Sequence, residues 1–190
     1  MSSSDEEGDA NVTQLSGIPY DNKRQADLYW RQIEQLKGAA VCIRLYRNKL
    51  AKKVKMVEII KAVASSGAIA GWFASESYKL FWGCIIAAAQ LLDVLKDVFP
   101  FAKQHKQAAS LTVALELLLI DAEDEWEKIH IGKIENAAIT ERRTRLRKLQ
   151  LEAEQKHFPE GFEPDHKIVA LATEETRTYF LITYDLEAKP

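Results

Sequence analysis

The feature that most constrains this chain is a pair of apolar blocks enclosed by charged residues. No charge occurs between positions 62 and 75 or between positions 80 and 92, and Glu76 lies in the polar break between them. As a helix each block covers roughly 20 Å, whereas the hydrocarbon core of a bilayer is about 30 Å thick. The sequence predicts two antiparallel helices, either inserted in a membrane or forming the tip of a soluble bundle.

Charged residues beyond the blocks fall in register across such a hairpin. With the turn in the polar break, Lys61 faces Asp93 and Glu58 faces Lys96. In water each pair adds about 0.2–0.5 kcal/mol of stability. At a membrane boundary the pairs neutralise each other and lengthen the two spans, and in an oligomer Lys61 and Asp93 could line a polar path.

The distribution of charge favours the membrane. Residues 44–55 (RLYRNKLAKKVK) are strongly basic and directly precede the first block, whereas the connecting loop carries only Glu76 and Lys79. This is the positive-inside pattern of two spans with both termini in the cytoplasm. We therefore expect membrane spans at about residues 57–75 and 79–99.

Small and aromatic residues within the blocks suit close packing at a membrane. Gly67 and Gly71 form a GxxxG spacing, and with Gly83 they permit a close approach of the two helices. Trp72 and Trp82 lie near the loop, where an interfacial aromatic belt is expected. In a soluble bundle the same glycines pack a tight hairpin, and the two tryptophans contact the core or a partner.

The rest of the sequence predicts an all-α fold, because helical spacing of apolar residues dominates and there are only 8 Gly and 5 Pro. Breaks or bends are expected at Gly38, Pro100 and Gly132. The expected parts are a disordered acidic tail (1–20), a helical hairpin domain (21–130), a charged helix (131–157) and a C-terminal extension (158–190). Residues 157–166 (HFPEGFEPDH) predict a loop rich in Pro and Gly, and a short helix is expected to follow it.

No motif for catalysis, cofactor binding or metal binding is present, and we do not expect an enzyme. His157 and His166 flank an acidic loop, which usually means solvated histidines rather than a metal site. The acidic run 121–127 and the basic run 142–149 read as solvated helix faces.

Charge and cysteine content narrow the function further. The net charge of -2 does not favour nucleic acid, so binding of nucleic acid through residues 44–55 is the weakest interpretation. Cys42 and Cys84 match no metal or redox spacing, and their apolar surroundings predict buried free thiols.

A basic lead-in (KLAKKVKMVEII), an apolar hairpin and a helical exit (FPFAKQHKQAASLTVALELL) follow one another over about residues 28–129. This order resembles the SLATT family, the SMODS- and SLOG-associating two-transmembrane effectors. The resemblance does not extend to the part from Glu135 on.

The resemblance implies a membrane effector of a bacterial defence or conflict system, triggered by a sensor or nucleotide-signalling partner protein to form a pore or leak. We accordingly expect a homo-oligomer in the bacterial inner membrane, carried on a cytosolic helical stalk, with the lipid bilayer as its partner. The alternative is a soluble cytoplasmic helical-bundle adaptor without catalytic activity.

Overall fold

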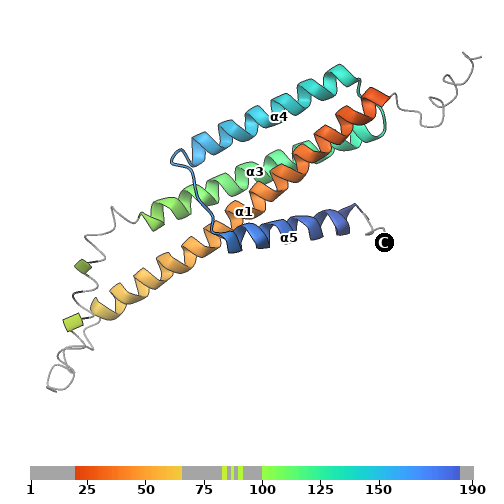
Figure 1. Ribbon diagram of the computed structural model, residues 1–190. Helices are drawn as coiled ribbons and strands as arrows, with labels where there is room; N and C mark the ends of the chain where they lie inside the picture. The colour runs from red at the N-terminus through yellow and green to blue at the C-terminus, as the bar shows by residue number, and fades with distance from the viewer. Residues whose placement is uncertain (1–19, 66–82, 85–86, 88–89, 92–99, 185–190) are drawn as a thin grey trace, which may run out of the picture.

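A computed structural model of the chain describes residues 20–65, 83–84, 87, 90–91 and 100–184 (Figure 1). Over these residues the protein is all-α, as predicted, and contains no strand. Its long helices are α1 (Tyr20–Ser65), α3 (Phe101–His130), α4 (Asn136–His157) and α5 (His166–Thr183).

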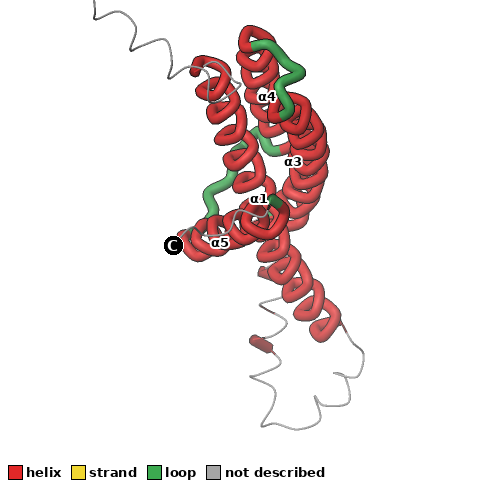
Figure 2. Tube along the Cα trace, turned by 90° about the vertical axis from the view of Figure 1, so that its right-hand side faces the viewer, coloured by secondary structure: helices red, strands yellow, loops and turns green. Residues whose placement is uncertain are grey.

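Helix α1 is the central element, and the other three helices all pack against it. α3 runs along α1, and α4 contacts both of them. α5 lies on the side of α1 away from α4, as Figures 1 and 2 show from two directions. The C-terminal segment that the family resemblance leaves unexplained is therefore part of the same helical bundle.

The core forms because α1 and α3 each carry an apolar stripe with helical spacing. The buried stripe of α1 comprises Tyr29, Ile33, Leu36, Ala40 and Ile43. The facing stripe of α3 comprises Leu111, Leu115, Leu119 and Ala122. Burying one large aliphatic side chain contributes about 1.5–3 kcal/mol, so this interface is the main source of stability in the described bundle.

Gly38 does not interrupt α1, which is one helix from Tyr20 to Ser65. The helix continues through it because residues on both sides, such as Leu36 and Ala40, are fixed by packing in the core. A Cβ added at Gly38 would lie 3.9 Å from Thr176 Oγ1 of α5, an ordinary contact distance. Tertiary packing thus overrides the low helix propensity of glycine here.

The other expected breaks are confirmed. α3 begins directly after Pro100, and it ends before Gly132, whose φ of 72° lies in the left-handed region that glycine adopts without strain. The loop between α4 and α5 is also present, and Gly161 within it has a φ of 69°. These positions are encoded locally by the backbone chemistry of proline and glycine.

Helix α5 is held at both ends. At its start the Asp165 carboxylate accepts a hydrogen bond from the Ile168 N–H at 2.9 Å, a standard N-cap. Near its other end the buried Phe180 ring packs edge-on against Trp30 of α1, with ring centres 5.1 Å apart. The predicted helix in the C-terminal extension is therefore confirmed and docked.

Candidate functional site

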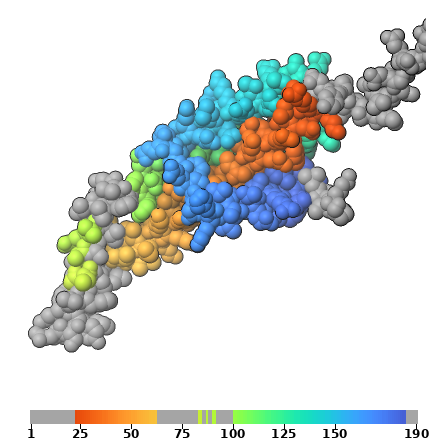
Figure 3. Space-filling model, viewed as in Figure 1, coloured from red at the N-terminus to blue at the C-terminus, as the bar shows by residue number. Residues whose placement is uncertain are grey.

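The end of the bundle where α1 leaves it is the first candidate site. Leu50 is the last buried residue in the described part of α1, and beyond it Met56 and Ile59 are 61% and 53% exposed. Lys53 Nζ lies 4.6 Å from the centre of the Phe101 ring, so α3 begins beside α1 at this level. The described chain thus leaves the bundle and returns to it at the same end, where α1 projects beyond α4 and α5 (Figure 3).

Five of the six cations of residues 44–55 divide into two groups, and the sixth, Arg47, donates hydrogen bonds to the neighbouring Asn48 side chain. Arg44 and Lys49 form ion pairs with Glu175 and Asp165 of α5. The hydrogen bond from Lys49, with that from the Ile168 N–H, holds the pKa of Asp165 below its ordinary value. The group nearer the end of α1 stays exposed and comprises Lys52, Lys53 and Lys55. Positive charge is therefore concentrated at the exit of α1, which we call the basic exit.

Most residues that the sequence assigns to the membrane hairpin lie outside the described part of the chain: Gly67, Gly71, Trp72, Trp82, Asp93 and Lys96. Gly83 is described in a helical position, and a Cβ added there would meet no atom of the described residues within 4 Å. On α1, Glu58 is exposed and Lys61 is half-buried. The charge pairs across the hairpin stay predictions.

No helix among the described residues combines the length and the apolar character that crossing a bilayer requires. The predicted spans, 57–75 and 79–99, run largely through residues that the structure does not describe. α1 supplies only the start of the first span, and Glu58 and Lys61 lie within that start.

The two cysteines differ in exposure. Cys42 is half-buried in α1, and burial raises the pKa of its thiol. Cys84 is exposed, so the predicted burial is wrong there. Apolar neighbours in the sequence bury a thiol only where another element packs over that face of the helix.

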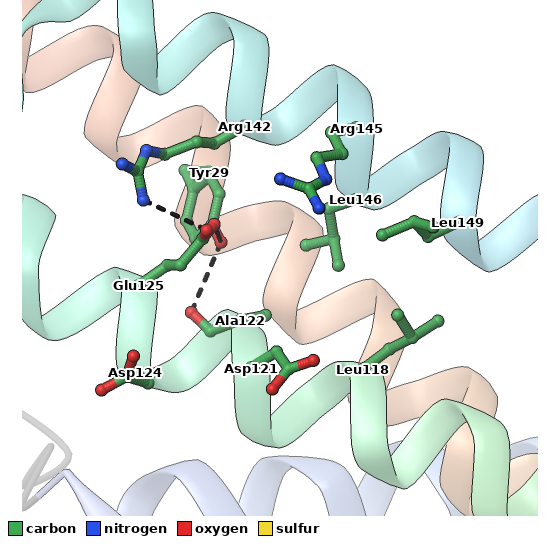
Figure 4. A pocket seen from close by; sticks show the side chains of 10 residues that line it. All are labelled: Tyr29, Leu118, Asp121, Ala122, Asp124, Glu125, Arg142, Arg145, Leu146 and Leu149. Carbon is green, nitrogen blue, oxygen red and sulfur yellow. Dashed lines mark hydrogen bonds and ion pairs between the residues drawn. The ribbon is translucent and has the colours of Figure 1, made fainter.

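A second candidate site is a cleft of about 200 Å³ between α3 and α4, lined by Tyr29 of α1 (Figure 4). The Tyr29 hydroxyl donates to one carboxylate oxygen of Glu125 at 3.0 Å, with the Ala122 carbonyl as a second acceptor at 3.4 Å. Arg142 Nη1 donates to the other Glu125 oxygen at 3.1 Å. We call these three side chains, Tyr29, Glu125 and Arg142, the clamp network.

The clamp network holds α1, α3 and α4 together rather than supplying a reactive group. Burial, followed by the charge of Glu125, raises the pKa of Tyr29 well above its ordinary value. The phenol is therefore neutral at physiological pH and acts as a donor. Because the Glu125 carboxylate is bound by both Tyr29 and Arg142, none of the three is poised as a base or a nucleophile.

The clamp network was not predicted, because both charged runs were expected to be solvated helix faces. That prediction is wrong for Glu125 and Arg142, which are half-buried. It is also wrong for Glu123, which accepts a hydrogen bond from Tyr179 at 2.7 Å. The available signal was the helical spacing, since Glu125 follows the buried Ala122 by three residues.

A third candidate site is an aromatic pocket of about 470 Å³. The Trp30 ring centre lies 5.0 Å from that of Trp126 and 4.8 Å from that of Tyr184, so α1, α3 and the end of α5 each contribute an aromatic face. Asp27 and Glu127 add carboxylates to the lining. Aromatic faces beside carboxylates suit a cationic or apolar side chain of a partner.

Among the described residues, no group of three or more His, Cys, Asp or Glu side chains is placed to hold a metal ion. His157 ends α4 and His166 begins α5, on either side of the connecting loop. Comparison of the chain with protein-family models, curated proteins and solved structures finds no match.

Proposed function

We propose that this protein is a membrane-associated effector in which the helical bundle carries an apolar hairpin to a bilayer. The observation that carries the proposal is the shared exit: α1 leaves the bundle and α3 returns to it side by side, as the Lys53–Phe101 contact records. From Lys53 to its end at Ser65, α1 extends about 18 Å further. Such a projection is suited to present the segment between Ser65 and Pro100 away from the bundle.

The charge at the shared exit supports the same proposal. The basic exit residues Lys52, Lys53 and Lys55 are directly followed by the exposed apolar residues Met56 and Ile59. Each lysine or arginine near an anionic lipid surface contributes about 1 kcal/mol of binding. In this arrangement the lysines bind lipid head groups while the apolar side chains enter the interface.

The resemblance to SLATT effectors supplies the biological part of the proposal. A sensor or nucleotide-signalling partner protein triggers the effector at the bacterial inner membrane, with both termini cytoplasmic. The protein then acts as a homo-oligomer that opens a pore or leak. Lys61 and Asp93 would line a polar path through it, because ionisable groups within a membrane face protein or water.

The experiment that tests the proposal is flotation of the full chain with vesicles of anionic or zwitterionic lipid. Lys52→Glu, Lys53→Glu and Lys55→Glu are combined in one variant. The matched control combines Lys23→Glu, Lys133→Glu and Lys148→Glu, which change net charge equally at exposed positions near the other end of the bundle or in the middle of α4. Three lysines at about 1 kcal/mol each predict roughly 100-fold weaker binding to anionic vesicles for the exit variant only.

Two outcomes contradict the proposal. One is a full chain that stays at the bottom of the gradient with both kinds of vesicle. The other is equal binding by the exit variant and its matched control, which would mean that the position of the lysines is irrelevant.

The second candidate function is a helical-bundle adaptor, and the aromatic pocket is the observation that favours it. There Trp30, Trp126 and Tyr184 would receive a cationic segment of a partner protein, with Asp27 and Glu127 neutralising its charge. A full chain that remains in the supernatant after ultracentrifugation without detergent, and that does not float with vesicles, favours this candidate. A partner whose binding is lost on Trp30→Ala then identifies the pocket as the docking site.

A further inference from the structure

The outer face of α3 carries an apolar stripe that no described helix covers. Val113 and Leu117 are each 58% exposed and Ile120 is 60% exposed. Charged and polar residues continue the same stripe at both ends. We call the whole set the α3 seam: Lys106, Ser110, Val113, Leu117, Ile120 and Asp124.

The α3 seam points away from the rest of the bundle. At about 100° per residue, Leu117 lies roughly 200° around the helix from Leu115, which is buried against α1. Figure 2 shows the same arrangement, with α3 along one edge of the bundle and the other helices to one side of it. A second molecule can therefore reach the seam without displacing α1, α4 or α5.

The spacing of the α3 seam is that of a coiled-coil contact face. Its members follow one another at intervals of four, three, four, three and four residues, the alternation of a heptad repeat. This alternation keeps one face of a helix directed toward a partner helix. One exposed leucine on a protein surface is common. Three apolar residues in heptad spacing, with polar residues at both ends, instead indicate a contact face.

The charges at the ends of the α3 seam specify both the occupant and its direction. Lys106 lies at the N-terminal end and Asp124 at the C-terminal end. In an antiparallel pair with the two-fold axis level with residue 115, Lys106 meets Asp124 of the second copy. Val113 then meets Leu117 of the second copy. A parallel pair would instead place lysine beside lysine and aspartate beside aspartate.

We propose that the α3 seam packs antiparallel against the α3 seam of a second copy of this chain and forms a two-fold symmetric dimer. Within one chain the Asp124 carboxylate also forms an ion pair with Lys128 at 2.5 Å. Because a carboxylate has two oxygens, Asp124 can accept hydrogen bonds from both Lys128 and Lys106 of the second copy. Because only Val113, Leu117 and Ile120 make up the apolar centre of the seam, we expect a contact smaller than the roughly 800 Å² per partner of a standard interface and therefore a reversible dimer. Because the two copies run antiparallel, their basic exits lie at opposite ends of the dimer and cannot face one bilayer together. The dimer is therefore a state of the chain separate from the pore-forming oligomer of the proposed function, and it does not depend on membrane insertion.

The first test measures the dimer dissociation constant of the full chain by analytical ultracentrifugation, in the buffer or detergent that keeps the chain monodisperse. Leu117→Asp places two buried charges in the symmetric interface and is expected to weaken the dimer at least about 100-fold. Leu171→Asp is the matched control, because Leu171 is 60% exposed on α5 and lies outside the seam. A full chain that is monomeric at all concentrations, or equal effects of the two substitutions, overturns the proposal.

The second test fixes the register. In a Cys42→Ser, Cys84→Ser background, a Val113→Cys chain is mixed with a Leu117→Cys chain under mild oxidation. The mixture is expected to form disulfide-linked dimers faster than either chain alone, because two copies of position 113 are offset by four residues, about 6 Å along the axis. No preference for the mixed pair overturns the antiparallel register.

Reversing the charges provides an independent check. In the symmetric dimer, Lys106→Glu places a glutamate opposite Asp124 at two equivalent contacts, so it is expected to weaken the dimer. Adding Asp124→Lys restores opposite charges at both contacts and is expected to restore the affinity of the dimer. Failure of the double variant to recover affinity contradicts the proposed pairing. Vesicle flotation of these variants distinguishes dimer formation from lipid binding. A variant that no longer dimerises but still floats shows that lipid binding by the basic exit does not require the dimer.

Discussion

Replacing Tyr29 by phenylalanine tests whether the clamp network stabilises the bundle. The ring is fully buried, and Phe retains its packing while removing the hydroxyl that donates to Glu125 at 3.0 Å. A hydrogen bond to a charged acceptor contributes about 1.5–3 kcal/mol, and Glu125 keeps its contact with Arg142 in the variant. We therefore expect Tyr29→Phe to lower the free energy of unfolding by about 1–2 kcal/mol. In a chain of this size each kcal/mol lowers Tm by roughly 2–4 °C.

The same substitution predicts a pH dependence. Because burial raises the pKa of Tyr29 in the folded protein above its ordinary value of 10.0, the phenol contributes fully to stability below pH 10. Its contribution is lost as the pH rises from there through the folded pKa, since the unfolded chain ionises first. The stability difference between the wild type and Tyr29→Phe should therefore narrow above pH 10, by at most about 1.4 kcal/mol per pH unit.

The assay is chemical denaturation of the full chain, followed by circular dichroism at several values between pH 7 and pH 11. Tyr46→Phe is the control at pH 7, because the half-buried Tyr46 hydroxyl makes no hydrogen bond to a described residue. Two results would show that the Tyr29 hydroxyl does not stabilise the bundle. One is a Tyr29→Phe variant as stable as the wild type at pH 7, and the other is a difference that stays constant up to pH 11.

Three further substitutions have expected outcomes. Gly38→Ala should raise the free energy of unfolding by about 0.4–1 kcal/mol in denaturation, because the added Cβ lies at an ordinary 3.9 Å from Thr176; destabilisation would mean that α1 bends there. Asp165→Ala removes the N-cap of α5 and should accelerate hydrogen exchange of the backbone amides in the first turn of that helix. In the wild type, the same amides should lose their protection from exchange at low pH. The loss should begin below the ordinary Asp pKa of 3.8 and continue through the lower pKa that Asp165 has in the folded protein. Phe180→Ala should lower the free energy of unfolding by about 3–5 kcal/mol and remove one of the rings that pack against Trp30. A decrease below about 1 kcal/mol would show that α5 is not docked.

Much of the helical layout follows from local sequence signals. Pro100 and Gly132 act through their own backbone chemistry, so they mark helix boundaries wherever they occur. The apolar stripes of α1 and α3 can also be predicted, because a spacing of three and four residues indicates a buried helix face whichever helix packs against it. Gly38 misleads for the opposite reason, since the packing of its neighbours outweighs its intrinsic propensity.

The clamp network and the docking of α5 depend on which helices become neighbours, and no local pattern states that. Glu125 lies among other acids, and only the position of Tyr29 and Arg142 on two other helices distinguishes it from a solvated side chain. The aromatic pocket is similar, because Trp30 and Trp126 are far apart in the sequence. The α3 seam, in contrast, has a readable heptad spacing, but its exposure is known only once α1 occupies the opposite face.

The most direct test of the central claim, that the segment beyond the basic exit enters a bilayer, uses Cys84. This exposed thiol lies in the predicted span 79–99, and in a Cys42→Ser background it can carry one environment-sensitive fluorophore. Membrane insertion predicts a blue shift with anionic vesicles and quenching by lipid-attached quenchers, whereas a label on Lys148→Cys in a Cys42→Ser, Cys84→Ser background should stay in water. An unchanged Cys84 spectrum that only water-soluble quenchers affect would show that this segment does not enter the bilayer.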